Sequence, residues 1–166
     1  MNATRPWVIL AGLAVVLIPL QVYLLPMLLP ERWVPDLGIL AVLWCGLFFG
    51  EGVGVVAGLL LGLLYDRFTA GVVGQHIFVL PCVGVGAAVA WRLVSRKGPA
   101  ARMVVVALFV VIGELGAAAL FALSDAILLD GWSVIHRLLP GITADVLFGA
   151  ALFGLADLAA ARRGVP

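Results

Sequence analysis

Long apolar runs and short polar breaks alternate along the whole chain. The apolar runs are Trp7 to Leu29, Leu37 to Leu64, Val72 to Val94, Met103 to Leu123 and Leu138 to Ala161. A helix needs about 20 mostly apolar residues to cross a bilayer, so each run is long enough to span one. Pro19 and Gln21 predict a kink in the first run, and Ser124 to Arg137 is the longest polar connection. The pattern predicts an all-α integral membrane protein.

The second run poses a choice, because its 28 residues exceed one span. A single helix of this length would measure about 42 Å, against a hydrocarbon core of about 30 Å. It would also carry Glu51 to the bilayer centre, where a charge costs at least about 2.5 kcal/mol. A break at Gly50-Glu51-Gly52 removes both problems. The sequence then predicts two short helices, Leu37 to Gly50 and Gly52 to Leu64, and six membrane segments in all. The short helices either cross the membrane twice or form a re-entrant pair.

Glycine recurs at every fourth position of the second run. The residues concerned are Gly46, Gly50, Gly54, Gly58 and Gly62. This spacing places them along one helix face, where the lack of side chains lets a neighbouring backbone approach closely. We interpret this face as a packing surface for another membrane helix.

Composition agrees with membrane residence. The chain is 64% hydrophobic and 11% charged, with a mean hydropathy of +1.23, whereas a soluble domain has roughly a quarter of its residues charged. We therefore expect one polytopic membrane domain over residues 1–166. A net charge of +1 argues against nucleic-acid binding. Cys45 and Cys82 lack metal-ligand spacing and are interpreted as small buried hydrophobic residues.

Basic residues predict the orientation. With six segments and a cytoplasmic N-terminus, the cytoplasmic side holds seven basic residues and the outer side three. The cytoplasmic set is Arg5, Arg92, Arg96, Lys97, Arg102, Arg162 and Arg163, and the outer set is Arg32, Arg67 and Arg137. Five spans with an external N-terminus give the same ratio, so the length and Glu51 arguments favour six. Both termini are then expected in the cytoplasm.

The central third of the chain carries a recognisable motif. Pro35-Asp36-Leu37 precedes the glycine-rich run, which continues as Gly58-x-x-x-Gly62-Leu63-Leu64-x-Asp66-x-x-x-x-Gly71-x-x-Gly74. This arrangement resembles the rod shape-determining protein MreD family. Arg67 after the aspartate and Glu51 within the glycine run depart from the family pattern.

The resemblance implies a small, multi-pass protein of the bacterial inner membrane that is not an enzyme and uses no cofactor. It implies binding to an MreC-like bitopic membrane protein. Through that protein, it implies membership of the cell-wall elongation machinery with MreB, RodA and a penicillin-binding transpeptidase. The implied fold has six helices and is similar to the substrate-binding subunits of energy-coupling-factor transporters.

Several ionisable or polar residues lie within the apolar runs and are candidates for lining a cavity. They are Glu51, Gln75, His76, Glu114 and Asp145. Glu114 lies near mid-membrane, where it is either a proton or ligand site or a protonated or paired group that locks helix packing. Asp145 and Asp157 lie about 18 Å apart on one helix and cannot act on one substrate. We expect Asp157 to form an interfacial ion pair with Arg162, and we find no catalytic triad or metal-ligand pattern.

Asp66 stands at the outer interface between Tyr65 and Phe68. It either caps the following helix or contacts a partner's juxtamembrane segment. Gly71 and Gly74 then permit the turn and close packing at the next helix start. The predicted function is a non-enzymatic scaffold whose candidate partner-binding residues are the five glycines of the second run with Asp66, Gly71 and Gly74. The alternative is a membrane subunit that binds a vitamin-like molecule for a transporter.

Overall fold

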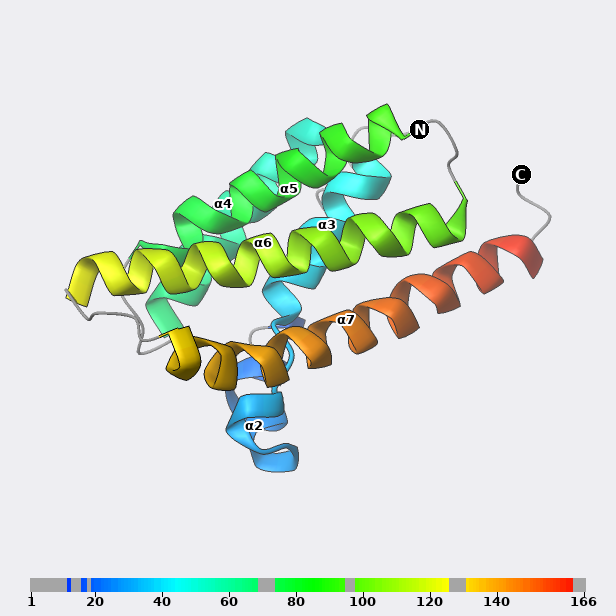
Figure 1. Ribbon diagram of the computed structural model, residues 1–166. Helices are drawn as coiled ribbons and strands as arrows, with labels where there is room; N and C mark the ends of the chain where they lie inside the picture. Colours follow the sequence, from blue (N-terminus) through cyan, green and yellow to red (C-terminus); the bar gives the residue numbers. More distant parts are fainter. Residues whose placement is uncertain are drawn as a thin grey trace.

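The computed structural model describes residues 12, 16–17, 19–68, 74–94, 98–125 and 131–162. Over these residues the chain is helical, with six α-helices that run α2 to α7 (Figure 1). Their bounds are Leu25–Leu28 for α2, Leu37–Phe49 for α3, Glu51–Phe68 for α4, Gln75–Leu93 for α5, Pro99–Asp125 for α6 and Gly131–Arg162 for α7. A π-helical turn, η1 (Leu20–Leu24), precedes α2, and a 3₁₀ turn, η2 (Glu31–Trp33), follows it.

Much of the first apolar run lies outside the described residues. Its second half carries the predicted irregularity, because π-helical hydrogen bonding begins at Leu20, immediately after Pro19. A proline removes one backbone donor from a helix, and π-turns are a common way to absorb such an interruption.

The predicted break within the long second run is confirmed. The helix α3 ends at Phe49, α4 begins at Glu51, and Gly50 between them has φ +91°. With ψ −179°, this extended backbone of positive φ is accessible to glycine without the penalty that a Cβ would bring. Gly46 contacts Gly54, and Gly38 lies against Tyr65, so α3 and α4 form an antiparallel hairpin. The helix α4 continues to Phe68, four residues beyond the predicted end at Leu64.

The short helix α3 forms the centre of the molecule. Ten of its 13 residues are buried, and they occupy every side of the helix. A helix that is apolar all round has to be covered all round, and α3 is packed by α4, α5, α6 and α7 (Figure 1). Its core residues include Ile39, Leu40, Val42 and Leu43, each at most 1% exposed.

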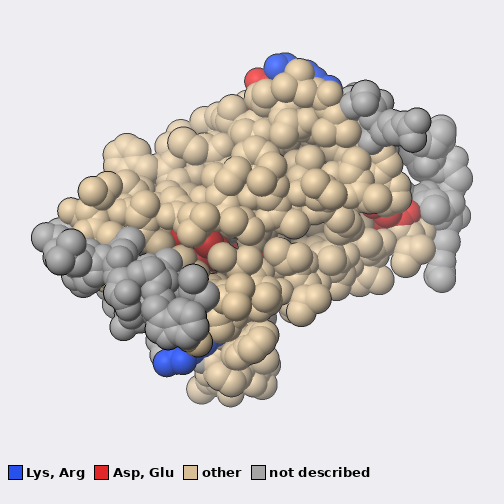
Figure 2. Space-filling view, viewed as in Figure 1, with Lys and Arg blue, Asp and Glu red and all other residues tan. Residues whose placement is uncertain are grey.

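Three described helices are long and apolar enough to cross a membrane, at Gln75–Leu93, Pro99–Leu123 and Leu138–Leu158. With the shorter apolar α3, they indicate a multi-pass membrane protein. Figure 2 shows the matching surface, which is mainly uncharged with small, separate patches of charge.

Two expectations need correction. The predicted polar connection from Ser124 to Arg137 is much shorter, because α6 extends to Asp125 and α7 already begins at Gly131. Cys82 is exposed on α5, whereas Cys45 is buried as expected. An apolar position in a membrane helix can face lipid as well as protein, and the sequence alone does not distinguish the two.

Candidate functional site

The glycine-lined face of α4 packs against α5. A Cβ added to Gly62 would lie 2.6 Å from the carbonyl oxygen of His76, and one added to Gly58 would lie 2.5 Å from Cα of Pro81. Further along, a Cβ on Gly54 would lie 3.0 Å from the carbonyl oxygen of Gly84. Gly46 of α3 also meets this carbonyl. The contacts at Gly58 and Gly62 are too short for any residue with a side chain, and the contact at Gly54 is tighter than most Cβ contacts. The glycines therefore allow three helical backbones to meet.

The face is therefore occupied within the chain, and a partner helix would have to displace α5 to reach it. Gly50 and Gly52 have open space around them and do not belong to this contact. Gly74 adopts φ +101° directly before α5, where it allows the turn into that helix. Gly71 lies outside the described residues. Gly46, Gly54, Gly58 and Gly62 thus pack helices as predicted, with α5 as the neighbour, whereas Gly50 does not.

Asp66 caps the beginning of α5 from the end of α4. Its Oδ2 accepts hydrogen bonds from the backbone N–H groups of Gly74 at 3.0 Å and Ile77 at 3.2 Å. Its Oδ1 accepts from the N–H of His76 at 3.0 Å and lies 2.8 Å from Nδ1 of the same residue. The first N–H groups of a helix have no partner within the helix, so Asp66 satisfies them in the way predicted from the motif. Contact between Asp66 and a partner protein stays a prediction.

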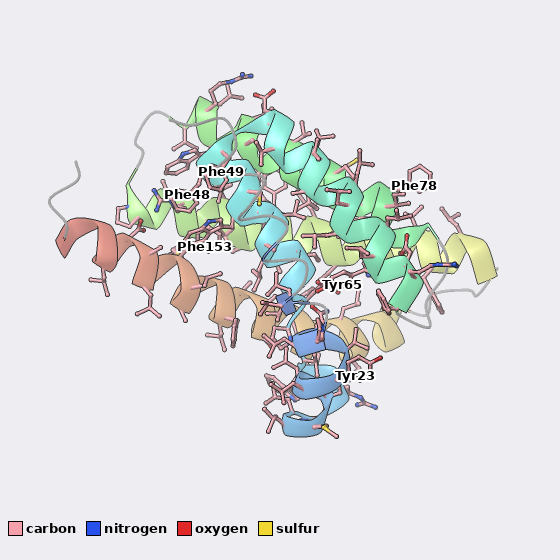
Figure 3. The ribbon with its side chains drawn as sticks, turned by 180° about the vertical axis from the view of Figure 1, so that it is seen from behind. Tyr23, Phe48, Phe49, Tyr65, Phe78 and Phe153 are labelled. Carbon is pink, nitrogen blue, oxygen red and sulfur yellow. The ribbon has the colours of Figure 1, made fainter. Side chains whose placement is uncertain are left out.

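A second polar group lies where α3 begins. Asp36 is the N-cap of α3, and its Oδ1 accepts hydrogen bonds from the N–H groups of Gly38 and Ile39 at 2.8 and 3.1 Å. Gln21 of η1 accepts from the N–H of Leu37 at 2.8 Å and from the hydroxyl of Tyr65 on α4. Figure 3 shows Tyr65 where α4 comes close to the start of α3. These contacts tie η1, α3 and α4 together at one end of the hairpin.

Two further carboxyl groups complete this group, which we call the buried polar cluster: Gln21, Asp36, Tyr65, Glu114 and Asp145. Asp145 of α7 is only 1% exposed, and its Oδ1 accepts a hydrogen bond from the backbone N–H of Asp36. Glu114 of α6 lies within hydrogen-bonding reach of Asp145, and both carboxyl groups lie close enough to Asp36 to interact with it electrostatically. Residues from five separate segments thus meet at one point.

The structure separates the other candidate cavity residues from this cluster. His76 pairs with Asp66, and Gln75 is a half-buried residue at the first position of α5. Glu51 lies at the far end of the α3–α4 hairpin and forms an ion pair with Arg92 at 2.7 Å. Of the five candidates, only Glu114 and Asp145 lie together. That they line a cavity stays a prediction.

Sequence reasoning missed Gln21, Asp36 and Tyr65 as members of this cluster. Pro35-Asp36 directly before an apolar run is a helix-start signal that could have identified the cap. Gln21 stood out as a polar residue inside an apolar run. The sequence contains no signal that brings Tyr65 to either of them.

A second cluster, of one ion pair and several aromatic rings, joins α6 and α7 at the end of the bundle opposite the buried polar cluster. Asp157 forms an ion pair with Arg102 of α6. The predicted pair with Arg162 stays a prediction, because the side chain of Arg162 lies outside the described part of the structure. The guanidinium of Arg102 also lies 4.9 Å from the centre of the Phe48 ring and 5.1 Å from that of Trp91. Figure 3 shows Phe48 beside Phe153 of α7, and Trp44 packs on both rings. Asp145 and Asp157 therefore serve separate sites on α7, as predicted.

Within the described residues, no group of three or more histidine, cysteine, aspartate or glutamate side chains is arranged to hold a metal ion. The chain matches the family model described as rod shape-determining protein MreD over residues 1–158. No significant match was found among curated proteins or solved structures. The chain therefore belongs to the rod shape-determining protein MreD family, which gives it a role in rod shape determination and associates it with the cell-shape machinery.

Proposed function

We propose that the chain is a non-enzymatic scaffold of the bacterial inner membrane that binds the transmembrane region of an MreC-like protein. Through that protein it would reach the elongation machinery of MreB, RodA and a penicillin-binding transpeptidase. Membership of the MreD family supports this role, since family members act in rod shape determination.

The observation that carries the proposal is that the described carboxylates Asp36, Asp66 and Asp157 cap helices or form ion pairs within the fold. Asp36 and Asp66 accept hydrogen bonds from backbone N–H groups at helix starts, and Asp157 pairs with Arg102. Each of these groups holds the fold together, because a capped helix start and a paired charge stabilise the bundle. These polar residues thus stabilise the helix bundle, and we infer that the partner protein is recognised by the outer surface of the bundle.

We infer that the partner meets the outward faces of the bundle. The glycine face is covered by α5, and α3 is surrounded by other helices. Large apolar side chains point outward from the covering helices, including Leu63 of α4, Phe78 of α5, Leu108 of α6 and Leu155 of α7. Figure 3 shows Phe78 directed away from the helices. Such a surface suits a single membrane helix, which associates through close packing.

Purification of the tagged chain from bacterial membranes in a mild detergent tests this function. We expect a bitopic, MreC-like protein to co-elute in a fixed ratio, and a tagged polytopic membrane protein from another family serves as the control. Native mass spectrometry of the same sample examines the alternative of a transporter subunit. A stoichiometric vitamin-like molecule, in a sample without any co-eluting membrane protein, would contradict the scaffold and support the carrier.

A further inference from the structure

The buried polar cluster contains an oxygen atom without a described partner. Oδ1 of Asp145 accepts the backbone N–H of Asp36, whereas Oδ2 is buried and has no hydrogen-bond donor within the described part of the chain. A buried carboxylate oxygen left without a donor is costly, so such atoms call for a particular explanation.

The groups that face Asp145 are themselves acidic. Asp36 approaches from the segment before α3, Glu114 from α6, and the hydroxyl-bearing Tyr65 from α4. Within the described residues, no lysine or arginine interacts electrostatically with Glu114 or Asp145. Arg92 and Arg102 pair at the opposite end of the bundle, and Arg32 and Arg67 are exposed. Two neighbouring carboxylates in a site with little water cannot both carry a charge without a strong penalty.

We propose that Glu114 and Asp145 share one proton, so that one carboxyl group is neutral and donates a hydrogen bond to the other. The pair then carries a single negative charge, and the donated hydrogen gives Oδ2 of Asp145 its missing partner. The N–H of Asp36 stabilises the remaining charge from the other side through Oδ1. The structure thereby assigns a proton-binding site that joins α6 and α7 to the beginning of α3, independently of any partner protein.

Infrared spectroscopy tests the proposal directly, because a protonated carboxyl group has a carbonyl stretch distinct from that of a carboxylate. The full-length protein in detergent at neutral pH is expected to show a band of a buried carboxylic acid. Glu114→Gln and Asp145→Asn should each abolish this band. Asp157→Asn is the matched control on the same helix as Asp145, and it should leave the band intact because Asp157 pairs with Arg102.

Both amide variants keep a hydrogen-bond donor where the shared proton lies, so we expect them to fold, as circular dichroism can verify. If one variant does not fold, the other still decides the question. A wild-type spectrum without a carboxylic acid band would overturn the proposal. So would a band that persists in a folded Glu114→Gln or Asp145→Asn variant. A stoichiometric metal ion that is lost in these variants would also overturn it, because the cation would then take the place of the proton.

Discussion

The backbone N–H of Asp36 donates a hydrogen bond to the side chain of Asp145, a residue 109 positions further along the chain. This contact joins the start of the central helix α3 to the middle of α7. Because Asp36 also caps α3 with its own carboxylate, one residue fixes both the helix start and its position in the bundle.

Gly58→Ala should destabilise the protein although alanine is otherwise the better helix former. The new Cβ would lie 2.5 Å from Cα of Pro81, so α4 and α5 would have to separate. We expect a loss of about 1–3 kcal/mol, which is typical of overpacking. Gly52→Ala is the matched control on the same helix, since nothing lies within 4 Å of its added Cβ. Reversible unfolding in mixed micelles measures both variants, and equal losses would contradict the proposed close packing.

Gly50→Ala separates backbone conformation from packing. Space is open around this residue, but its φ of +91° and ψ of −179° lie in a region of backbone conformation that is essentially restricted to glycine, and holding another residue there costs about 1–3 kcal/mol. We expect a loss of that size in unfolding free energy, without any steric contact. A variant as stable as the wild type would show that the turn between α3 and α4 does not need glycine.

Asp66→Ala should loosen the beginning of α5. The variant removes the acceptor of three backbone N–H groups, and losing a helix cap costs about 0.5–2 kcal/mol. Hydrogen exchange followed by mass spectrometry should show faster exchange at His76 and Ile77, whose N–H groups Asp66 accepts. Arg67→Ala, one residue away on an exposed position, is the control. Unchanged exchange at His76 in Asp66→Ala would argue against the cap.

Arg102→Ala should destabilise the protein more than Arg92→Ala. The side chain of Arg102 is 17% exposed and contacts Asp157, Phe48 and Trp91, whereas that of Arg92 is 66% exposed and contacts Glu51. Exposed ion pairs contribute about 0–1 kcal/mol, and the loss of a hydrogen bond to a charged group together with ring packing costs about 1.5–3 kcal/mol. The free energy of unfolding is measured in mixed micelles at low and high salt. The loss caused by Arg92→Ala should shrink at high salt, whereas the loss caused by Arg102→Ala should change little. The reverse order of losses would contradict this interpretation.

Glu114→Ala and Glu114→Gln should differ in stability. Alanine leaves Oδ2 of Asp145 without a donor, which costs about 1–3 kcal/mol, whereas glutamine supplies an N–H donor in nearly the same shape. We therefore expect Glu114→Gln to lie within about 1 kcal/mol of the wild type on the scale of single hydrogen bonds. Unfolding in mixed micelles measures the stability of both variants. A Glu114→Gln variant less stable than Glu114→Ala would contradict the structural role of the Glu114–Asp145 pair.

The sequence predicted those features that depend on neighbouring residues. The break at Gly50 follows from the length of one apolar run and from the position of Glu51, and the cap by Asp66 follows from its place before a helix start. The glycine spacing indicated close backbone contact but not which helix makes it, since a groove in one helix carries no information about its neighbour. Gln21, Asp36, Tyr65, Glu114 and Asp145 are far apart in the chain, so only the fold could show that they meet. The similarity to transporter subunits, the count of six spans and the orientation in the membrane stay predictions.

Disulfide mapping in bacterial membranes tests most directly whether the partner meets the outside of the bundle. Cys45 and Cys82 are first replaced by alanine, and single cysteines are then placed at Leu63, Phe78, Leu108, Leu155 or the fully buried Ala57. Each is combined with cysteines scanned along the transmembrane helix of the MreC-like protein. We predict disulfides from one or more of the four outward positions and none from Ala57. A partner disulfide at Ala57, or none at any outward position, would contradict the account.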